Sequence, residues 1–446
     1  MATLRPQLHR LLAEAKESRT LAQLEALGEA GAAEEPPANA VVEVSLEAGA
    51  SPSRRLLAAA LLDYVLRLDP LVGEVRVEGF EPAVLEELSS RLPLDHADSS
   101  RPTDFSLKVG GSGDCDLTLD AGGWLAALGE AIEFDEERVL NPIGPLAAAC
   151  LGTGEVFKAL FAASYPGALA VSRFEPALGR FSFYDYGSAE FGPELSALKI
   201  DATLLGLGGV GAGVLRALAV LRAHLHGRLR LIDHDVLDLH SLNRVTYATV
   251  EQAVDGAEKA TCAKAYLDAA CPQLRVLAHS EEFDQFKRGL SPRRSERRYE
   301  TLITALDSDE VRHAAQRELP QVLIDGSTGL DLNVRVERVV FGQWGCLGCT
   351  RQAPPPVIEE AEGCGHFIDP RAPSVSFLAA LPGTLAASEL IKEAMRAEGS
   401  LRGEFQHVFY GAPNPEICSE PARREDCLVG CMNADWLAAY EAKYAA

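Results

Sequence analysis

The sequence predicts an α/β protein with mostly parallel sheets. Between residues 41 and 119, short apolar strands alternate with amphipathic helices, and this alternation is typical of parallel sheets whose strands are joined by helices. Residues 200–244 contain a second such series: an apolar strand, a glycine turn, an Ala- and Leu-rich helix and another apolar strand. The chain of 446 residues is 47% hydrophobic, which suits a globular protein of about three domains.

The chain begins with a charged, amphipathic segment that we expect to be helical over residues 1–30. The paired prolines Pro36 and Pro37 cannot continue a helix, so residues 1–40 are predicted to form an N-terminal helix and a linker. The first half then predicts strands at 41–46, 72–77 and 116–119, and helices at 53–68 and 82–91. Its sequence contains no glycine-rich phosphate turn.

A phosphate-binding turn is predicted where the first strand of the second series meets its helix. The turn carries Gly206, Gly208, Gly209 and Gly211. Glycine lets the backbone turn tightly and approach an anion, and the following helix points free N–H groups at it. Asp233 ends the next strand, where a carboxylate can bind ribose hydroxyls. Such glycine patterns commonly bind NAD or FAD, so an NAD-dependent oxidoreductase remains an alternative.

Polar residues beyond this unit favour ATP over a dinucleotide. Asp235, Asn243, Arg244 and Lys259 follow the second strand, and Asp307 ends another apolar strand. An arginine and a lysine that face a triphosphate stabilise the charge that develops on its oxygens during cleavage. A carboxylate such as that of Asp307 suits Mg²⁺.

These motifs resemble those of the E1-like adenylating enzymes, which include the ubiquitin-activating enzymes and their bacterial relatives of the MoeB and ThiF type. The resemblance covers roughly residues 199–431. The family usually has Asn and Gln where this chain has Ser241 and Val245, so a binding scaffold with an inactive ATP site is a further alternative. The matching pieces are Gly206–Gly211, Ile232–Val236, Leu242–Arg244, Lys259 and Asp307 with Arg312.

The resemblance implies two Rossmann-like adenylation folds packed back to back, one of which loses its nucleotide site in larger members. Asn141–Lys158 and Pro373–Lys392 are both rich in small residues and end in Glu-apolar-apolar-Lys, which beside the resemblance favours an internal duplication. We therefore expect an inactive adenylation-like domain at 41–170, a linker at 171–197 and an active adenylation domain at 198–446.

Four cysteines near the C-terminus predict a structural zinc site. Cys346 and Cys349 form a CxxC pair and Cys427 and Cys431 a CxxxC pair, and four thiolates give zinc a closed tetrahedral site. In the family, two such pairs tie a crossover region to the C-terminal tail. The family normally has CxxC in the second pair, so Cys418 is an alternative ligand. Unrelated thiols are the other reading of these cysteines.

Cys364 is the predicted catalytic nucleophile. It lies in an expected crossover loop at 350–372, where E1-like enzymes carry their catalytic cysteine. A thiolate there can convert an acyl-adenylate into a thioester. His366 favours the thiolate and the acidic neighbours oppose it. The alternatives are an ordinary loop thiol or a spare zinc ligand.

The resemblance implies an E1-like enzyme that uses ATP and Mg²⁺ to adenylate the C-terminus of a ubiquitin-like protein. Cys364, Arg244 and Asp307 would be its catalytic residues, and an E2-like protein would receive the thioester. A single chain with one degenerate half resembles the E1 enzymes of bacterial ubiquitin-like conjugation systems, including antiviral ones. The alternative within enzymes is a sulfur-carrier protein adenylyltransferase for cofactor biosynthesis. A homodimer is possible.

Charge and composition limit which classes of partner, and which cellular compartment, we expect for the protein. The net charge of −23 argues against nucleic acid as a partner, because phosphate binding needs clustered Lys and Arg. We expect no apolar run long enough to span a membrane. Ten cysteines without a secretory signal are expected to be thiols or metal ligands, which predicts a cytoplasmic protein.

Overall fold

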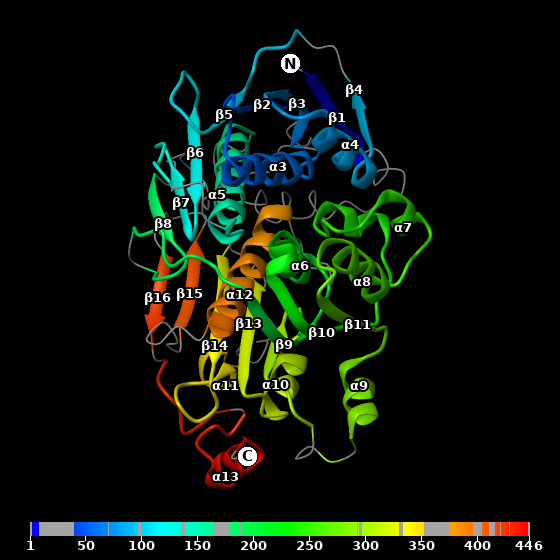
Figure 1. Cartoon of the computed structure of the whole chain (residues 1–446), viewed down its shortest axis with the longest axis vertical. Coiled ribbons are helices and arrows are strands. Elements are labelled where there is room, and N and C mark those ends of the chain that lie inside the picture. The colour runs from blue at the N-terminus through cyan, green and yellow to red at the C-terminus, as the bar shows by residue number, and fades with distance from the viewer. Residues whose placement is uncertain are drawn as a thin grey trace, which may run out of the picture.

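The computed structural model contains two eight-stranded sheets, one in each half of the chain (Figure 1). Between them, helix α12 (Ser376–Met395) packs against both α5 (Ile143–Ser164) and α6 (Gly209–Leu221). The residues described by the structure are 2–8, 40–69, 71–96, 100–134, 139–164, 178–186, 189–291, 293, 297–329, 333–351, 375–395, 404–409, 415–419, 421–427 and 429–444.

The first sheet has the strand order β4-β1-β3-β2-β5-β6-β7-β8, and its four central strands, β3, β2, β5 and β6, are parallel. The apolar side chains of β2, β3 and β6 are buried, which explains why the sequence pattern located these three strands. Strand β5, which the sequence did not predict, pairs between β2 and β6. The strands are β1 (Ala2–Pro6), β2 (Ala40–Leu46), β3 (Val72–Glu78), β4 (Leu94–His96), β5 (Phe105–Val109), β6 (Leu117–Gly122), β7 (Leu125–Leu128) and β8 (Gly179–Ser182), and the other helices are α3 (Pro52–Leu66) and α4 (Pro82–Arg91).

The second sheet has the order β11-β10-β9-β12-β13-β14-β15-β16, with five parallel strands followed by three antiparallel ones. Its strands are β9 (Leu198–Leu205), β10 (Leu225–Ile232), β11 (Leu274–His279), β12 (Thr301–Thr304), β13 (Val322–Thr328), β14 (Asn333–Val339), β15 (Glu404–Phe409) and β16 (Pro415–Ser419). The short helices are η1 (Arg222–His224), η2 (Leu239–Asn243), α7 (Val250–Val254), α8 (Lys259–Ala270), α9 (Phe283–Leu290), α10 (Asp309–Arg317), α11 (Leu347–Thr350) and α13 (Ala434–Tyr444).

The two halves repeat one arrangement, which confirms the predicted fold class. In each, a strand, a helix and a parallel strand (β2-α3-β3 and β9-α6-β10) lead into a sheet that ends in antiparallel strands. Helices α5 and α12 pack against each other. Each carries a buried ion pair of the repeated motif, Lys158 with Glu155 at 2.7 Å and Lys392 with Glu389 at 2.6 Å.

A buried ion cluster joins the halves. Asp63 of α3 accepts hydrogen bonds from Arg67 at 2.8 Å and from Arg216 of α6 at 2.5 Å. Arg67 also donates to the backbone carbonyl of Leu242 in η2. Asp63 and Arg67 are fully buried, so an element of the first half directly supports a loop of the second.

In the first half, side chains pair with one another at the end of β2, the position that corresponds to the glycine turn after β9. Arg54, in the first turn of α3, donates to Asp120 at 2.8 and 3.0 Å and to Glu47 at 3.1 Å. Glu47 directly follows β2, as Gly206 directly follows β9. A bidentate arginine pair therefore lies where the second half has a glycine turn.

Two expectations from the sequence are wrong. Ala2–Pro6 is not helical: it forms β1, because Leu4 and Pro6 alternate into the core while the strand pairs with β3. The remainder of the expected N-terminal helix and linker lies outside the described residues. Strand β8 lies within the expected linker at 171–197 and pairs with β7, so this part of the segment extends the first sheet. Finally, Ile143–Leu160 is long and apolar enough to cross a membrane, although 94% of it is buried within the protein, as in a core helix.

Candidate active site

The strand register brings the predicted nucleotide residues to one edge of the second sheet. Leu205 of β9 pairs with Ile232 of β10 and with Thr304 of β12. The residues that follow these strand ends, including Gly206 and Asp233, therefore emerge side by side. In parallel sheets this carboxyl edge is the usual place for a ligand.

The glycine turn is built so that only glycine fits at two positions. Gly206 has φ +87°, and a Cβ there would lie 2.4 Å from the carbonyl oxygen of Ala305. A Cβ on Gly211 would lie 2.2 Å from the carbonyl oxygen of Gly206. Gly208 caps α6 and has no atom within 4 Å of its Cβ position, so the turn is open on that side. The open side faces the N-terminal end of α6, which favours an anion.

Asp233 is fixed beside this turn. One carboxylate oxygen accepts the N–H of Leu207 at 2.7 Å, and the other accepts the N–H of Asp235 at 2.9 Å. The buried hydroxyl of Tyr247 donates to the carbonyl of Leu207 at 2.8 Å from the other side. Each oxygen of Asp233 keeps further acceptor capacity, which is what binding a ribose diol requires.

Arg244 lies against the glycine turn. A Cβ on Gly209 would approach the Cβ and Cγ of Arg244 to 3.2 Å. The Arg244 guanidinium donates to the side chain of Asn243 at 2.9 Å and to the carbonyl of His240 at 3.0 Å. The preceding η2 begins with a capping box in which Ser241 and Asp238 bond each other. Thus Ser241, which departs from the family pattern, has a structural role.

Lys259 and Asp235 form the second charged element of the edge. The ammonium of Lys259 donates to Asp235 at 2.7 Å, and its backbone N–H donates to the Asp235 carbonyl at 3.0 Å. Burial would raise the pKa of Asp235, but the hydrogen bond and charge of Lys259 outweigh it and hold that pKa below the ordinary value. The pair thus places the Lys259 side chain at this edge of the sheet, beside Asp235.

Asp307 lies in the turn between β12 and α10. Its side chain is exposed, and within the part of the chain that the structure describes it makes no hydrogen bond or ion pair. Arg312, five residues on, has its side chain in the protein interior. It bonds Asp325 at 3.0 Å, Asp309 at 2.9 Å and the carbonyl of Leu306.

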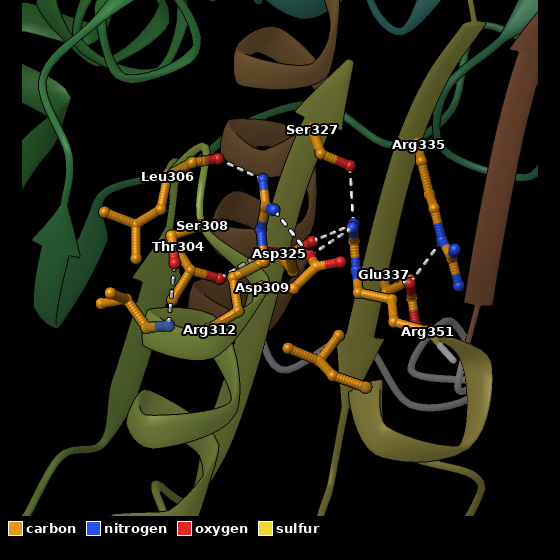
Figure 2. A network of polar contacts seen from close by, with 12 residues as sticks. Thr304, Leu306, Ser308, Asp309, Arg312, Asp325, Ser327, Arg335, Glu337 and Arg351 are labelled. Carbon is orange, nitrogen blue, oxygen red and sulfur yellow. Dashed lines mark hydrogen bonds and ion pairs between the residues drawn. The ribbon is translucent and has the colours of Figure 1, made fainter. Parts of the chain in front are cut away.

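Figure 2 shows a polar network that the sequence did not suggest, centred on Asp325 of β13. Its carboxylate accepts hydrogen bonds from Thr304 at 2.6 Å, from Arg312 at 3.0 Å and from Arg351 at 2.5 Å. Glu337, which lies opposite Asp325 on β14, is fully buried, and burial raises its pKa despite the nearby arginines. No short motif joins these residues, so only the fold brings them together.

The four predicted cysteines form one cluster. The sulfur of Cys346 lies 3.3 Å from that of Cys427, and the sulfur of Cys349 lies 3.3 Å from that of Cys431. All four sulfurs are within 4.8 Å of one another. Four Zn–S bonds in a tetrahedron place the sulfurs about 3.8 Å apart, so this donor set fits zinc. Hydrogen bonds, first that from Cys346, lower the pKa of Cys431 to about 5, whereas the hydrogen bond with Cys431 raises the pKa of Cys346 and burial raises that of Cys349.

Two further cysteines singled out from the sequence, Cys364 and Cys418, are not among the four cysteines of the cluster. Cys364, with His366, lies outside the described residues. Cys418 belongs to β16, where it pairs with Phe405 in the sheet. The CxxxC pair itself supplies two sulfurs to the cluster, so no substitute ligand is needed to complete four.

Comparison with known proteins gives the family. Residues 191–429 match the model of the ThiF family. The chain is 31% identical over 236 residues to the uncharacterized protein y4jF of Sinorhizobium fredii, which covers 52% of this chain and 43% of that protein. It is 28% identical over 182 residues to the Nedd8-activating enzyme E1 catalytic subunit of Drosophila melanogaster, covering 37% and 38%. The chain thus spans less than half the length of either relative.

Among solved structures, the chain is loosely similar to Escherichia coli MccB with ATP, at 15% identity and a TM-score of 0.39 over 71% of this chain and 98% of that one. It is similar to PaaA at 14% identity and a TM-score of 0.36, over 65% and 77%. The match to the family model covers more than half of the chain, and it includes the glycine turn, Arg244, Lys259 and Asp307. The chain is therefore a member of the ThiF family.

Proposed function

We propose that the chain is an ATP-dependent activating enzyme for a ubiquitin-like protein. The observation that carries the proposal is the meeting, at one sheet edge, of an open glycine turn, the fixed carboxylate of Asp233, the guanidinium of Arg244 and the ammonium of Lys259. These groups match the parts of ATP in charge and kind: N–H groups and cations for phosphates, an acceptor for ribose.

The proposed reaction has two steps. In the first, the C-terminal carboxylate of the partner protein attacks the α-phosphorus of ATP, and pyrophosphate leaves. Arg244 and Lys259 stabilise the charge on the phosphate oxygens as that bond breaks, with Asn243 orienting Arg244. Asp235 holds Lys259 until a phosphate competes for it. Asp307 has free oxygens with which to hold Mg²⁺, which neutralises phosphate charge when bound.

In the second step, the thiolate of Cys364 attacks the acyl carbon of the adenylate, and AMP leaves with the electrons of the acyl–phosphate bond. The resulting thioester is passed to an E2-like protein. The chemistry uses ATP and a free thiol, which both suit the cytoplasm. The similarity to the Nedd8-activating catalytic subunit supports a ubiquitin-like substrate.

The test is to incubate the protein with Mg-ATP and candidate ubiquitin-like proteins, and to follow pyrophosphate exchange and intact mass. We expect exchange, and a thiol-sensitive adduct that Cys364→Ala abolishes. Cys115→Ala, in a half-buried loop of the first half, is the matched control and should keep the adduct. Exchange without an adduct would instead favour a sulfur-carrier adenylyltransferase. NAD binding without ATP binding would refute both readings.

We also propose that the four-cysteine cluster holds one structural zinc ion. We expect about one zinc per purified chain, and its loss in Cys349→Ser, because a closed tetrahedral site needs all four sulfurs. The variant should also unfold at a lower temperature, since binding free energy of a structural metal is folding free energy. Zinc content by elemental analysis and thermal unfolding measure this, with Cys115→Ser as control. A wild-type protein without metal would disprove the site.

A further inference from the structure

We infer that Arg351 is a positioning residue that ties the loop carrying Asp307 to the cysteine cluster. The inference rests on the proposed role of Asp307 as the Mg²⁺ ligand. Arg351 comes two residues after Cys349 and directly follows α11, whose N-cap is Cys346. Its backbone N–H donates to the carbonyl of Leu347 at 2.7 Å. The place of Arg351 is therefore set by the cluster.

The Arg351 side chain points toward Asp325 and Ser327 of β13 (Figure 2). Its guanidinium donates to Asp325 at 2.5 Å, to Ser327 at 2.6 Å and to Asp309 at 3.2 Å. It is 9% exposed. Three acceptors on two different elements, β13 and α10, thus meet on one buried cation.

Arg312 completes the arrangement from the opposite side. It bonds the other oxygen of Asp325, shares the Asp309 carboxylate with Arg351, and donates to the carbonyl of Leu306. Asp325 is fully buried. Removal of either guanidinium would leave buried charge incompletely paired, which is costly, so the two arginines hold each other in place.

Asp307 lies between the two points that these arginines fix. Leu306 before it is held by its carbonyl, and Asp309 beyond it is held by its carboxylate. Asp307 itself projects to solvent, with no partner among the described residues. The network therefore fixes the backbone on both sides of Asp307 and leaves its carboxylate free. Through Arg351, that fixation depends on the cysteine cluster some forty residues further along the chain.

The test compares Arg351→Met with Arg424→Met, which also alters an arginine beside the cluster but one that pairs with the exposed Asp426. The first readout is hydrogen exchange of the peptide covering residues 305–311. We expect faster exchange of this peptide in Arg351→Met, with zinc content unchanged, and wild-type exchange in Arg424→Met. Chelation of zinc from the wild type should also speed hydrogen exchange of this peptide. In Arg351→Met chelation should change the exchange rate little further, because the contact between the cluster and the loop is already lost.

The second readout is the Mg²⁺ concentration needed for half-maximal pyrophosphate exchange. Partners that orient a metal ligand typically contribute about 10- to 100-fold in affinity, and we expect a rise of that order in Arg351→Met, partly reversed in Arg351→Lys. Unchanged exchange of residues 305–311, or an equal change in the control, would overturn the inference. Failure of the proposed function would appear differently: the wild type would show no pyrophosphate exchange, while the hydrogen-exchange comparison would still decide the role of Arg351.

Discussion

An Arg244→Met variant is expected to lose about a hundred- to a thousand-fold of its pyrophosphate-exchange activity, the usual cost of removing one preorganised donor from a developing anion. The guanidinium lies against the glycine turn and is oriented by Asn243 and the carbonyl of His240. Methionine keeps the length of the aliphatic stem, which packs beside Gly209, and removes only the charge. The fold should therefore remain, and the loss should be mainly in kcat.

The matched control for Arg244 is Arg228→Met. Arg228 lies on β10, well before the carboxyl end of the strand, and pairs with the partly exposed Asp201. Its replacement should leave exchange activity near that of the wild type. Equal losses in the two variants would show that Arg244 acts through the fold, and no loss in Arg244→Met would remove it from the proposed phosphate site.

The second large effect is expected from Asp63→Asn, which should lower the free energy of unfolding by about 3–5 kcal/mol. Asp63 neutralises two guanidinium groups, Arg67 and Arg216, that are almost completely buried between the halves. Asparagine is similar in size but carries no charge, so both cations would remain in the interior without a counter-ion. Urea unfolding followed by circular dichroism measures the change.

Asp201→Asn is the matched control, because Asp201 also pairs with two arginines, Arg228 and Arg230, but is partly exposed. Exposed pairs contribute about 0–1 kcal/mol, so the loss should be small. Equal losses of unfolding free energy in Asp63→Asn and Asp201→Asn would show that burial does not make the Asp63 ion pairs more stabilising than exposed ones.

The effect of Asp63 should also depend on pH. Burial alone would raise its pKa, but Arg67 and Arg216 outweigh burial and hold the pKa below its ordinary value. A carboxyl with a lowered pKa contributes stability that is present above the unfolded-state value of about 3.9, and that is lost as the pH falls through the folded-state value. The difference in the free energy of unfolding between the wild type and Asp63→Asn should therefore decrease as the pH falls below about 4.

The parts of the molecule that the sequence could predict are those in which neighbouring residues act together. The glycine turn, Asp233 and the strands on either side follow from local pattern, since one strand, one turn and one helix fix their geometry. The cysteine cluster could also be predicted, because only two pairs had to meet. The repeated Glu-apolar-apolar-Lys ending is visible in the sequence, and in the structure it forms a buried ion pair in both α5 and α12.

The network around Asp325 could not be predicted, because it depends on the register of strands. Asp325 meets Thr304 because β12 and β13 align those residues, and it meets Arg351 across 26 residues of sequence. Strand β1 was mispredicted for a related reason: five residues contain too little pattern to distinguish an alternating edge strand from the start of an amphipathic helix.

The ion pair of Arg54 with Asp120 gives the two halves different responses to ligand. In the first half the polar groups at this position already satisfy one another, so nothing has to enter for that half to be complete. In the second half the glycine turn is open and the carboxylate of Asp307 projects to solvent. Any ligand that binds the native protein raises its resistance to unfolding by mass action. Because, among the described residues, only the second half has such an open site, we expect a bound nucleotide to stabilise the whole chain through contacts made in that half alone.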